Sequence, residues 1–350
     1  MKAAYCQYKL KFKQPAITSR ATMHEKETFF IKLWEESTPN VYGLGECAIF
    51  RGLSADDRPD YEQVLIHVCR NINDLTGLNL DQYSSIKFGL ETAFNDLSNG
   101  GNRIIFPSEW SNGNSVIQIN GLVWMGSFKE MYHRISEKLD KGFKCVKLKV
   151  GGIDFESELN LLKFIREQFA PSQLELRVDA NGAFSAENAL TKLSQISKFQ
   201  IHSIEQPIKP HQCEAMADIC KKSPIPVALD EELIGIDCYN EKLDLIDKIK
   251  PHYLILKPSL CGGFSGAEEW ITLAKANGIG WWATSALESN IGLNAISQWV
   301  ATLSPQIPQG LGTGQLYTNN IESPLLQTGE VIKYDNNQQW QIPALNWVEP

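Results

Sequence analysis

The feature that most constrains the fold is a series of short apolar runs, each of which ends in a charged residue. Four of these runs end at Asp179, Glu205, Asp230 and Lys257, at intervals of 26, 25 and 27 residues. A fifth run, KCVKLK, ends at Lys149, 30 residues before Asp179. Intervals of this size fit one strand followed by one helix, so they predict a parallel sheet with crossover helices. In barrels of this kind the carboxyl ends of the strands carry the chemistry, and the charged residues lie at those ends.

Apolar runs and helix-like segments alternate from residue 115 onward. Eight runs fit strands, and they lie at 116–121, 144–150, 174–179, 201–206, 226–230, 253–257, 278–285 and 309–313. About seven helical segments separate them, and the last run is followed by a tail. The pattern therefore predicts an α/β protein with a (β/α)-barrel of the (β/α)7β type over residues 111–316.

The first 110 residues have a different pattern and form a separate predicted domain. Three β-rich runs at 4–12, 28–34 and 40–50 precede two helix-like segments at 61–73 and 82–98, which predicts an α+β domain over residues 1–110. A stretch rich in Gly, Asn, Pro and Ser at 98–114 leads into the barrel. We expect the tail, 317–350, with a strand-like run at 331–334, to pack back on this first domain.

Three of the strand-terminal residues are acidic, and they belong to consecutive strands. Neighbouring strands lie about 4.8 Å apart, so the carboxylates of Asp179, Glu205 and Asp230 can converge on one ion. Each of them taken alone is better explained as a strand or helix cap, but three in succession on one rim favour a metal site. Because the set contains no His or Cys, it suits Mg²⁺, with Mn²⁺ able to substitute, and not zinc.

Two lysines flank the predicted metal site from opposite sides. Lys149 would end the second strand and Lys257 the sixth, and these strands are diametrically opposed in an eight-stranded barrel. A nearby dication and burial lower the pKa of a lysine toward the range of a general base. Lys147 points to the same face as Lys149, where it either lowers the pKa of that residue or lines the pocket.

Composition excludes several classes of function. A net charge of −8 and a pI near 5.4, without a basic stripe, argue against nucleic acid as a partner. The apolar content of the first residues is broken by Lys9, Lys11 and Lys13, and no run reaches membrane length, so we expect a cytoplasmic protein that does not bind membranes. Eight cysteines without a CxxC pair predict buried, reduced thiols, and the glycine-rich pieces lack a dinucleotide fingerprint.

Six motifs in order resemble the muconate-cycloisomerase subgroup of the enolase superfamily: KLKVG, LRVDANGAF, IEQP, LDEEL, LILKPSLCGG and ATSALESNIG. The similarity runs from Gly43 to about Gly314. It implies that the first domain caps the barrel. It also implies roles for residues on the rim: Lys149 as the base, Lys257 as the opposed amine, and Asp179, Glu205 and Asp230 as the metal ligands.

The resemblance also implies a small carboxylate as substrate, and it suggests which residues bind it. Thr284 and Ser285 follow the seventh strand, where a hydroxyl can donate to a carboxylate, although strand-end hydroxyls more often cap the backbone. Lys147 lines the same predicted pocket. Arg20, between the first two strands, falls in the loop that closes over the pocket in enolase-superfamily folds. The sequence leaves the oligomeric state open.

Within the subgroup, the motifs are most similar to those of the o-succinylbenzoate synthases, the dehydratases of menaquinone biosynthesis. Two departures from sister groups narrow the assignment. Thr284 and Ser285 occupy the place of the histidine used by mandelate-racemase-like members, and GLGTGQLYT lacks the Asp-x-Asp with which dipeptide epimerases hold an amine. An N-acylamino-acid racemase or dipeptide epimerase with the same residues is the alternative. A non-catalytic binding protein is the remote one, because all five charged positions are present.

Overall fold

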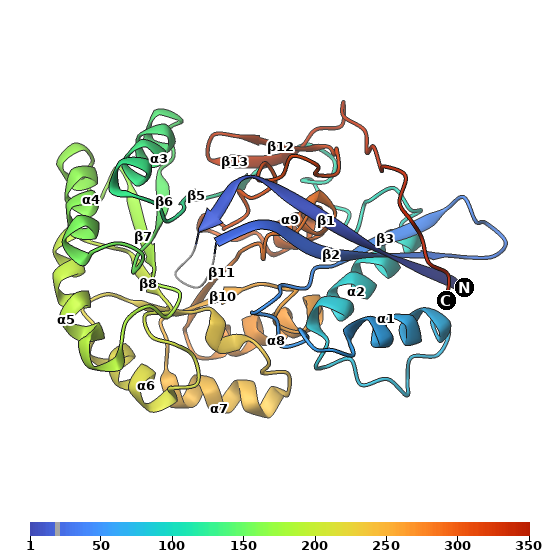
Figure 1. The fold of residues 1–350 in the computed structure, drawn as a ribbon, viewed down its shortest axis with the longest axis horizontal. Coiled ribbons are helices and arrows are strands. Elements are labelled where there is room, and N and C mark those ends of the chain that lie inside the picture. Colours follow the sequence, from blue (N-terminus) through green and yellow to red (C-terminus); the bar gives the residue numbers. More distant parts are fainter. Residues whose placement is uncertain (18–21) are drawn as a thin grey trace.

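The N-terminal part of the molecule consists of an antiparallel sheet with two helices packed against it. The computed structural model describes residues 1–17 and 22–350. Strands β1 (Lys2–Ile17), β2 (Thr22–Trp34) and β3 (Tyr42–Cys47) form an antiparallel sheet, and helices α1 (Tyr61–Arg70) and α2 (Ser84–Ser98) pack against it (Figure 1). Apolar residues from all five elements share one core. The predicted strands and helices of this region are therefore present, with β1 and β2 longer than the apolar runs that indicated them.

A parallel sheet of seven strands forms the larger part, as predicted for a (β/α)-barrel. Its order follows the sequence, from β5 to β11, and one helix follows each strand on the outside of the curve (Figure 1). The strands are β5 (Gly121–Val123), β6 (Cys145–Lys149), β7 (Glu175–Asp179), β8 (Ser203–Glu205), β9 (Val227–Leu229), β10 (Tyr253–Leu256) and β11 (Gly280–Ala283). The helices are α3 (Phe128–Asp140), α4 (Phe155–Gln168), α5 (Ala186–Ile196), α6 (Cys213–Lys222), α7 (Tyr239–Ile249), α8 (Gly263–Ala276) and α9 (Asn290–Leu303).

Local sequence signals fix where several of these helices begin. Ser127 starts α3 with a reciprocal capping box, in which its backbone N–H donates to Glu130 at 2.8 Å. Asp154 starts α4 by accepting the backbone N–H of Ser157 at 2.9 Å. Such caps satisfy amide groups that the first turn of a helix leaves without partners, and each stabilises the helix by ~1 kcal/mol.

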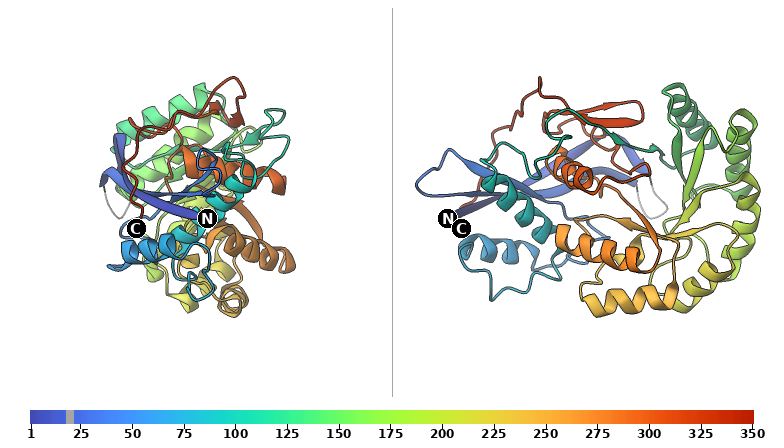
Figure 2. Two further views of the ribbon diagram at one scale, coloured as in Figure 1. Left: turned by 90° about the vertical axis from the view of Figure 1, so that its right-hand side faces the viewer. Right: turned by 180° about the vertical axis from the view of Figure 1, so that it is seen from behind.

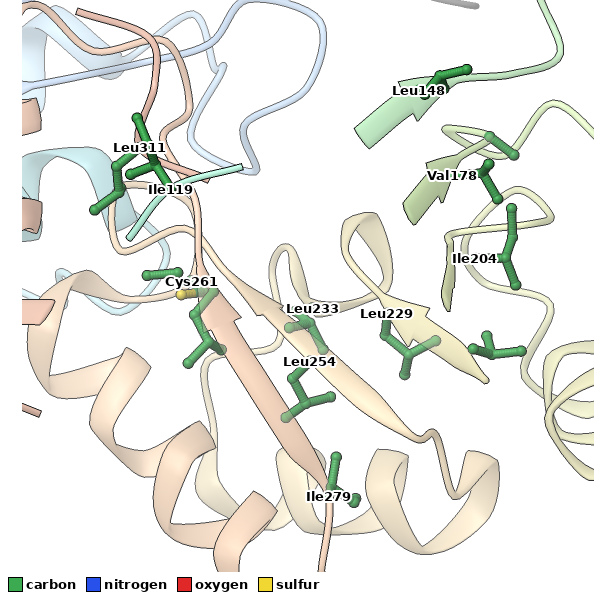
Figure 3. Close-up of a cluster of buried hydrophobic side chains, with 14 of the residues drawn as sticks. Ile119, Leu148, Val178, Ile204, Leu229, Leu233, Leu254, Cys261, Ile279 and Leu311 are labelled. Atoms are coloured by element: carbon green, nitrogen blue, oxygen red, sulfur yellow. The ribbon is translucent and has the colours of Figure 1, made fainter. Parts of the chain in front are cut away.

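Side chains alternate along the barrel strands between an outward face, which packs in the apolar core, and an inward face. Leu148, Val178, Ile204, Leu229 and Leu254 point outward and pack beneath the helices in the main apolar core (Figure 3). The residues between them point inward, because successive side chains of a strand face opposite sides. The inward residues near the carboxyl ends are mostly charged.

The barrel closes through an irregular seam, and here the expected first strand is wrong in its bounds. Instead of one strand over 116–121, β4 (Ile117–Gln118) pairs with the C-terminal tail, and β5 pairs with β6. The eighth strand is reduced to bridges: Gln309 pairs with Ile119, and Gly310 pairs with Thr284. A Cβ at Gly310 would lie 2.2 Å from the Thr284 hydroxyl oxygen, so only glycine permits this close approach. A run of alternating residues cannot reveal that its two halves pair with different partners.

The tail returns to the N-terminal sheet and to the barrel seam. Strands β12 (Leu325–Thr328) and β13 (Val331–Tyr334) form a small sheet with β4, and Val348 pairs with Tyr5 at 3.0 and 2.8 Å. The two ends of the chain consequently lie close together (Figure 2). Within the described residues, no helix is both long and apolar enough to span a bilayer. All eight cysteines are free, as predicted, although Cys213 is half-buried and Cys238 is exposed, contrary to the expectation of burial.

Candidate active site

A cavity lies at the carboxyl ends of the barrel strands, under the N-terminal domain. Its cationic wall comes from the barrel and consists of Lys147, Lys149 and Lys257. Its apolar wall combines residues of both parts of the molecule: Met23, Phe50, Leu53, Leu122, Trp124, Leu260 and Leu287. The cavity therefore offers positive charge at one side and space for an apolar ring beside it.

Three of the five predicted metal and base residues, Lys149, Asp179 and Glu205, meet in one buried cluster with Lys147, and the other two form a separate pair. The ammonium of Lys149 donates to Asp179 at 2.5 Å, and that of Lys147 donates to Asp179 at 3.1 Å and to both oxygens of Glu205 at 3.0 and 2.8 Å. Asp179 and Glu205 are direct neighbours in the register of β7 and β8. Lys257 donates to Asp230 at 2.5 Å. Each carboxylate is thus held by an ammonium group.

The charges of this cluster shift one another. Burial on its own raises the pKa of Asp179, but Lys149 and Lys147 outweigh burial and hold that pKa well below its usual range. Lys257 likewise lowers the pKa of Asp230 against the effect of burial. For Glu205, burial and the neighbouring charge of Asp179 prevail, and its pKa is raised. Dense negative charge favours protonation of this one carboxylate.

Two of the cavity lysines, Lys257 and Lys147, have raised pKa values. Burial lowers the pKa of Lys257, but Asp230 and Glu231 raise it more. The pKa of Lys147 is raised in the same way by Glu205 and Asp179. Both lysines are therefore stabilised as cations, which suits groups that face developing negative charge.

The donor set fits a hard divalent cation, although the carboxylates contact lysines in this arrangement. Asp179, Glu205 and Asp230 are almost fully buried and offer only oxygen donors. Burial and mutual repulsion raise the pKa of Glu205, and a dication among these groups relieves that repulsion. Among the described residues, no group of three or more His, Cys, Asp or Glu side chains is gathered closely enough to hold a metal. The metal role of this triad consequently stays a prediction.

The predicted substrate-binding hydroxyls line the cavity but already have partners. Thr284 donates to the backbone carbonyl of Gly310 at 2.9 Å, and Ser285 donates to Glu288 at 2.5 Å. The hydroxyl of Thr284 therefore supports the seam of the barrel, which is the alternative given for strand-end hydroxyls. Lys147 also lines the cavity, as expected. Arg20, the fourth residue of the predicted set, lies outside the described residues.

Two amides that the sequence did not single out hold the charged groups in place. Asn181 accepts from Lys149 at 2.7 Å and donates to Glu231 at 2.9 Å. Gln206 accepts from the backbone N–H of Asp230 at 3.1 Å and donates to Glu232 at 3.1 Å. Both have positive φ, 44° for Asn181 and 37° for Gln206, which is uncommon for these residues. Their positions one or two residues after the acidic strand ends were the only signal in the sequence.

Comparison with known proteins defines the class. The family model of enolase C-terminal domain-like proteins matches residues 130–333. The chain therefore belongs to this family, within the enolase superfamily, as the motifs predicted. It is 43% identical to the o-succinylbenzoate synthase of Desulfotalea psychrophila, over 95% of this chain and 98% of that one.

Solved structures show the same fold over nearly the whole chain. The crystal structure of MenC from Desulfotalea psychrophila matches with a TM-score of 0.84 and 41% identity, and covers 95% of this chain and 99% of that one. The dipeptide epimerase of Enterococcus faecalis, solved with Mg and the dipeptide L-Leu-L-Tyr, matches with a TM-score of 0.81 over 97% of both chains. At 18% identity, this second likeness concerns the fold alone.

Proposed function

We propose that this chain is an o-succinylbenzoate synthase, a dehydratase that converts 2-succinyl-6-hydroxy-2,4-cyclohexadiene-1-carboxylate to 2-succinylbenzoate. Its pathway is menaquinone biosynthesis and its compartment is the cytoplasm. The near full-length similarity to a synthase at 43% identity supports this assignment. The observation that carries it within the site is the character of the cavity. Three ammonium groups and an apolar wall line it, and none of its described lining residues is acidic.

The charge of the cavity separates this substrate from that of a dipeptide epimerase. A dipeptide presents a free ammonium group, and binding it in a pocket lined by three ammonium groups would require an acidic partner. The dianionic cyclohexadiene acid has the complementary charge, and its ring matches the apolar wall formed by Phe50, Leu53 and Trp124. Burial of the ring strengthens the attraction between the lysines and the carboxylate.

The lysines divide the chemistry between them. Lys149 removes the proton α to the carboxylate, and negative charge spreads onto the carboxylate oxygens as an enediolate. Lys257, held as a cation by Asp230, stabilises that charge from the other side. Lys149 then returns its proton to the departing hydroxyl, so one molecule of water leaves and the ring becomes aromatic. Asn181 keeps the Lys149 amine in place through both steps.

We assign Asp179, Glu205 and Asp230 as the residues that hold Mg²⁺, with Mn²⁺ able to replace it. When bound there, the ion supplies electrostatic stabilisation to the substrate carboxylate. The all-oxygen donor set of these carboxylates supports this choice of metal. Lys147 donates hydrogen bonds to both Asp179 and Glu205, so its positive charge would offset part of their negative charge around the ion.

The test is a comparison of kcat/KM for the cyclohexadiene acid with values for a panel of N-acylamino acids and dipeptides, in the presence of Mg²⁺. We expect efficient dehydration and slow or absent racemisation. Both types of enzyme exchange an α-proton with solvent, so exchange alone does not discriminate. If any amino-acid derivative is turned over faster than the cyclohexadiene acid, the synthase assignment is wrong.

One observation favours an N-acylamino-acid racemase as the second candidate. Lys149 and Lys257 both line the cavity, and two opposed amines can act as base and acid on the two faces of one carbon. An N-acylated amino acid carries no ammonium group, so the charge of the cavity does not exclude it. The same panel decides between the two activities.

A further inference from the structure

Two buried polar side chains in the cavity have an atom without a partner. The hydroxyl oxygen of Thr313 and the amide oxygen of Asn120 are inaccessible to solvent and have no hydrogen-bond partner among the described residues. The two residues are only 4% and 3% exposed, and both line the cavity. A buried polar group without a partner destabilises a protein by about 1–3 kcal/mol, so such groups call for an explanation.

Both residues lie at the seam where the barrel closes. Asn120 follows Ile119, which pairs with Gln309, and its backbone N–H donates to the carbonyl of Gln309 at 2.9 Å. Thr313 follows the bridged segment by a few residues. Ile119 and Leu311 of this seam lie together, on the other side of the barrel from Val178 and Ile204 (Figure 3).

The seam faces the strands that carry the carboxylates. In the closed ring the seam holds the first and eighth positions, whereas Glu205 and Asp230 end the fourth and fifth strands. A ligand whose carboxylate lies between Lys149 and Lys257 therefore directs its remaining substituents toward the seam. The intervening wall is apolar, with Leu122, Trp124 and Leu287 among its members.

We propose that Thr313 and Asn120 form a binding site for an oxygen-bearing side chain next to the ring carboxylate of the ligand. This inference rests on the proposed function and identifies the succinyl chain as the group recognised. The hydroxyl of Thr313 donates to a keto or carboxylate oxygen of that chain. The amide of Asn120 uses one N–H for the Gly121 carbonyl at 3.3 Å and directs the other, with its oxygen, to the ligand or a water held with it.

Recognition at the seam is by neutral groups, because the three cations of the cavity belong to β6 and to the end of β10 and not to the seam. A site made of a hydroxyl and an amide accepts a keto or carboxylate oxygen and leaves both of its own groups satisfied. A ligand without such a chain leaves them buried and unpaired. The site therefore favours ligands that carry the oxygen-bearing chain, because a ligand without it leaves two buried polar groups without hydrogen bonds.

The experiment measures binding of 2-succinylbenzoate and of benzoate by calorimetry, with Mg²⁺ present, to the wild type and to matched variants. Thr313→Val keeps the shape of the side chain and removes the hydroxyl, whereas Thr313→Ser keeps the hydroxyl. Thr272→Val, on the exposed face of α8, is the control for the substitution itself. Asn120→Ala tests the second group.

We expect Thr313→Val and Asn120→Ala each to weaken 2-succinylbenzoate binding about tenfold, the size of one buried hydrogen bond, and to leave benzoate binding unchanged. Thr313→Ser and Thr272→Val should bind both ligands like the wild type. In catalysis, KM for the cyclohexadiene acid should rise more than kcat falls. Thr313→Ser also shows whether a loss in Thr313→Val comes from the hydroxyl or from misfolding.

Equal losses for the two ligands in Thr313→Val, no loss, or equal wild-type affinity for both ligands would each overturn the proposal. Wild-type turnover of the cyclohexadiene acid tests the function separately. An enzyme that binds 2-succinylbenzoate through Thr313 without producing it would refute the function and keep the site. If the enzyme produces 2-succinylbenzoate, but the wild type and Thr313→Val bind it equally well, the function stands and the site is refuted.

Discussion

Charged residues on the inward face of the barrel strands have two different roles, one in the cavity and one in packing. At the carboxyl end, Lys149 lines the cavity and forms an ion pair with Asp179 at 2.5 Å. Two residues earlier on β7, Arg177 also points inward and is 1% exposed. Its guanidinium lies 4.3 Å from the ring centre of Trp282 and donates to Glu175 at 2.7 Å.

This difference shows that charge inside a barrel does not by itself mark a reactive site. Arg177 does not line this cavity, and its planar group is packed on an aromatic face. It fills space and links β7 to the seam by donating to the carbonyl of Pro308 at 2.9 Å. Lys149 lines the cavity and donates hydrogen bonds to Asp179 and Asn181. Access to the cavity therefore separates a structural charge from a catalytic one, and Arg177 and Lys149 should respond differently to substitution.

The largest expected effect comes from removing the metal. Treatment with EDTA should abolish dehydration, and Mg²⁺ or Mn²⁺ should restore it, because the triad offers three oxygen ligands and no soft donor. Asp230→Asn should lower both metal affinity, measured by calorimetry, and activity. Full turnover of the chelated enzyme would show that the carboxyl-end cluster does its chemistry without a metal.

The next effect separates catalysis from stability. Lys149→Ala should reduce kcat by the ~10²–10⁴-fold typical of a general acid–base residue, with the circular dichroism spectrum and metal binding retained. Lys257→Ala should also be strongly impaired. Lys163→Ala, on the exposed face of α4, is the matched control and should keep wild-type activity. A near-normal rate in Lys149→Ala would remove this residue from the mechanism.

Substitution of Arg177 should lower stability and leave catalysis nearly unchanged. Arg177→Met removes two hydrogen bonds and a contact with Trp282, so the free energy of unfolding should fall by ~2–4 kcal/mol. Turnover by the folded fraction should change little, since Arg177 does not reach the cavity. Denaturant unfolding and kcat/KM measure the two quantities, and Arg70→Met at the exposed end of α1 is the control. A large loss of kcat without a loss of stability would contradict the division between the two roles.

The sequence predicted the carboxyl end better than the rest because its pattern repeats. Charged residues after apolar runs, at a constant interval, require little more than the geometry of parallel strands to be placed on one rim. The seam has no such repeat, since Ile119 and Gln309 pair as single bridges, and the orphan atoms of Asn120 and Thr313 follow from packing that no local pattern encodes. The pKa of Lys257 is raised because Asp230 lies 2.5 Å away, a contact that the apolar run before Lys257 does not reveal.

Asp237 is a partly buried carboxylate in a third kind of environment, and we expect the smallest effect from its substitution. Asp237 lies between the 3₁₀ turn after β9 and α7, and no lysine or arginine among the described residues is within ion-pairing distance of it. Burial, opposed by Lys242 and assisted by Asp81, raises its pKa to about 6. Its Oδ1 is buried without a hydrogen-bond partner in the described part of the chain. Asp179 and Asp230, which have ammonium partners, shift in the other direction.

The raised pKa of Asp237 predicts a dependence of stability on pH with a definite sign. The carboxyl group of an unfolded chain ionises near pH 4, whereas the folded one keeps its proton to about pH 6. The folded state thus binds more protons between these values, and its stability falls as the pH rises through this window. Asp237→Asn removes the ionisation and should raise the free energy of unfolding at pH 7.5 by ~1 kcal/mol, a value reduced for partial solvent exposure, with no gain at pH 4. Urea unfolding at both pH values, with Asp247→Asn on the exposed side of α7 as control, measures this difference. An equal gain at both pH values would mean that shape, and not an unpaired buried charge, limits stability at this position.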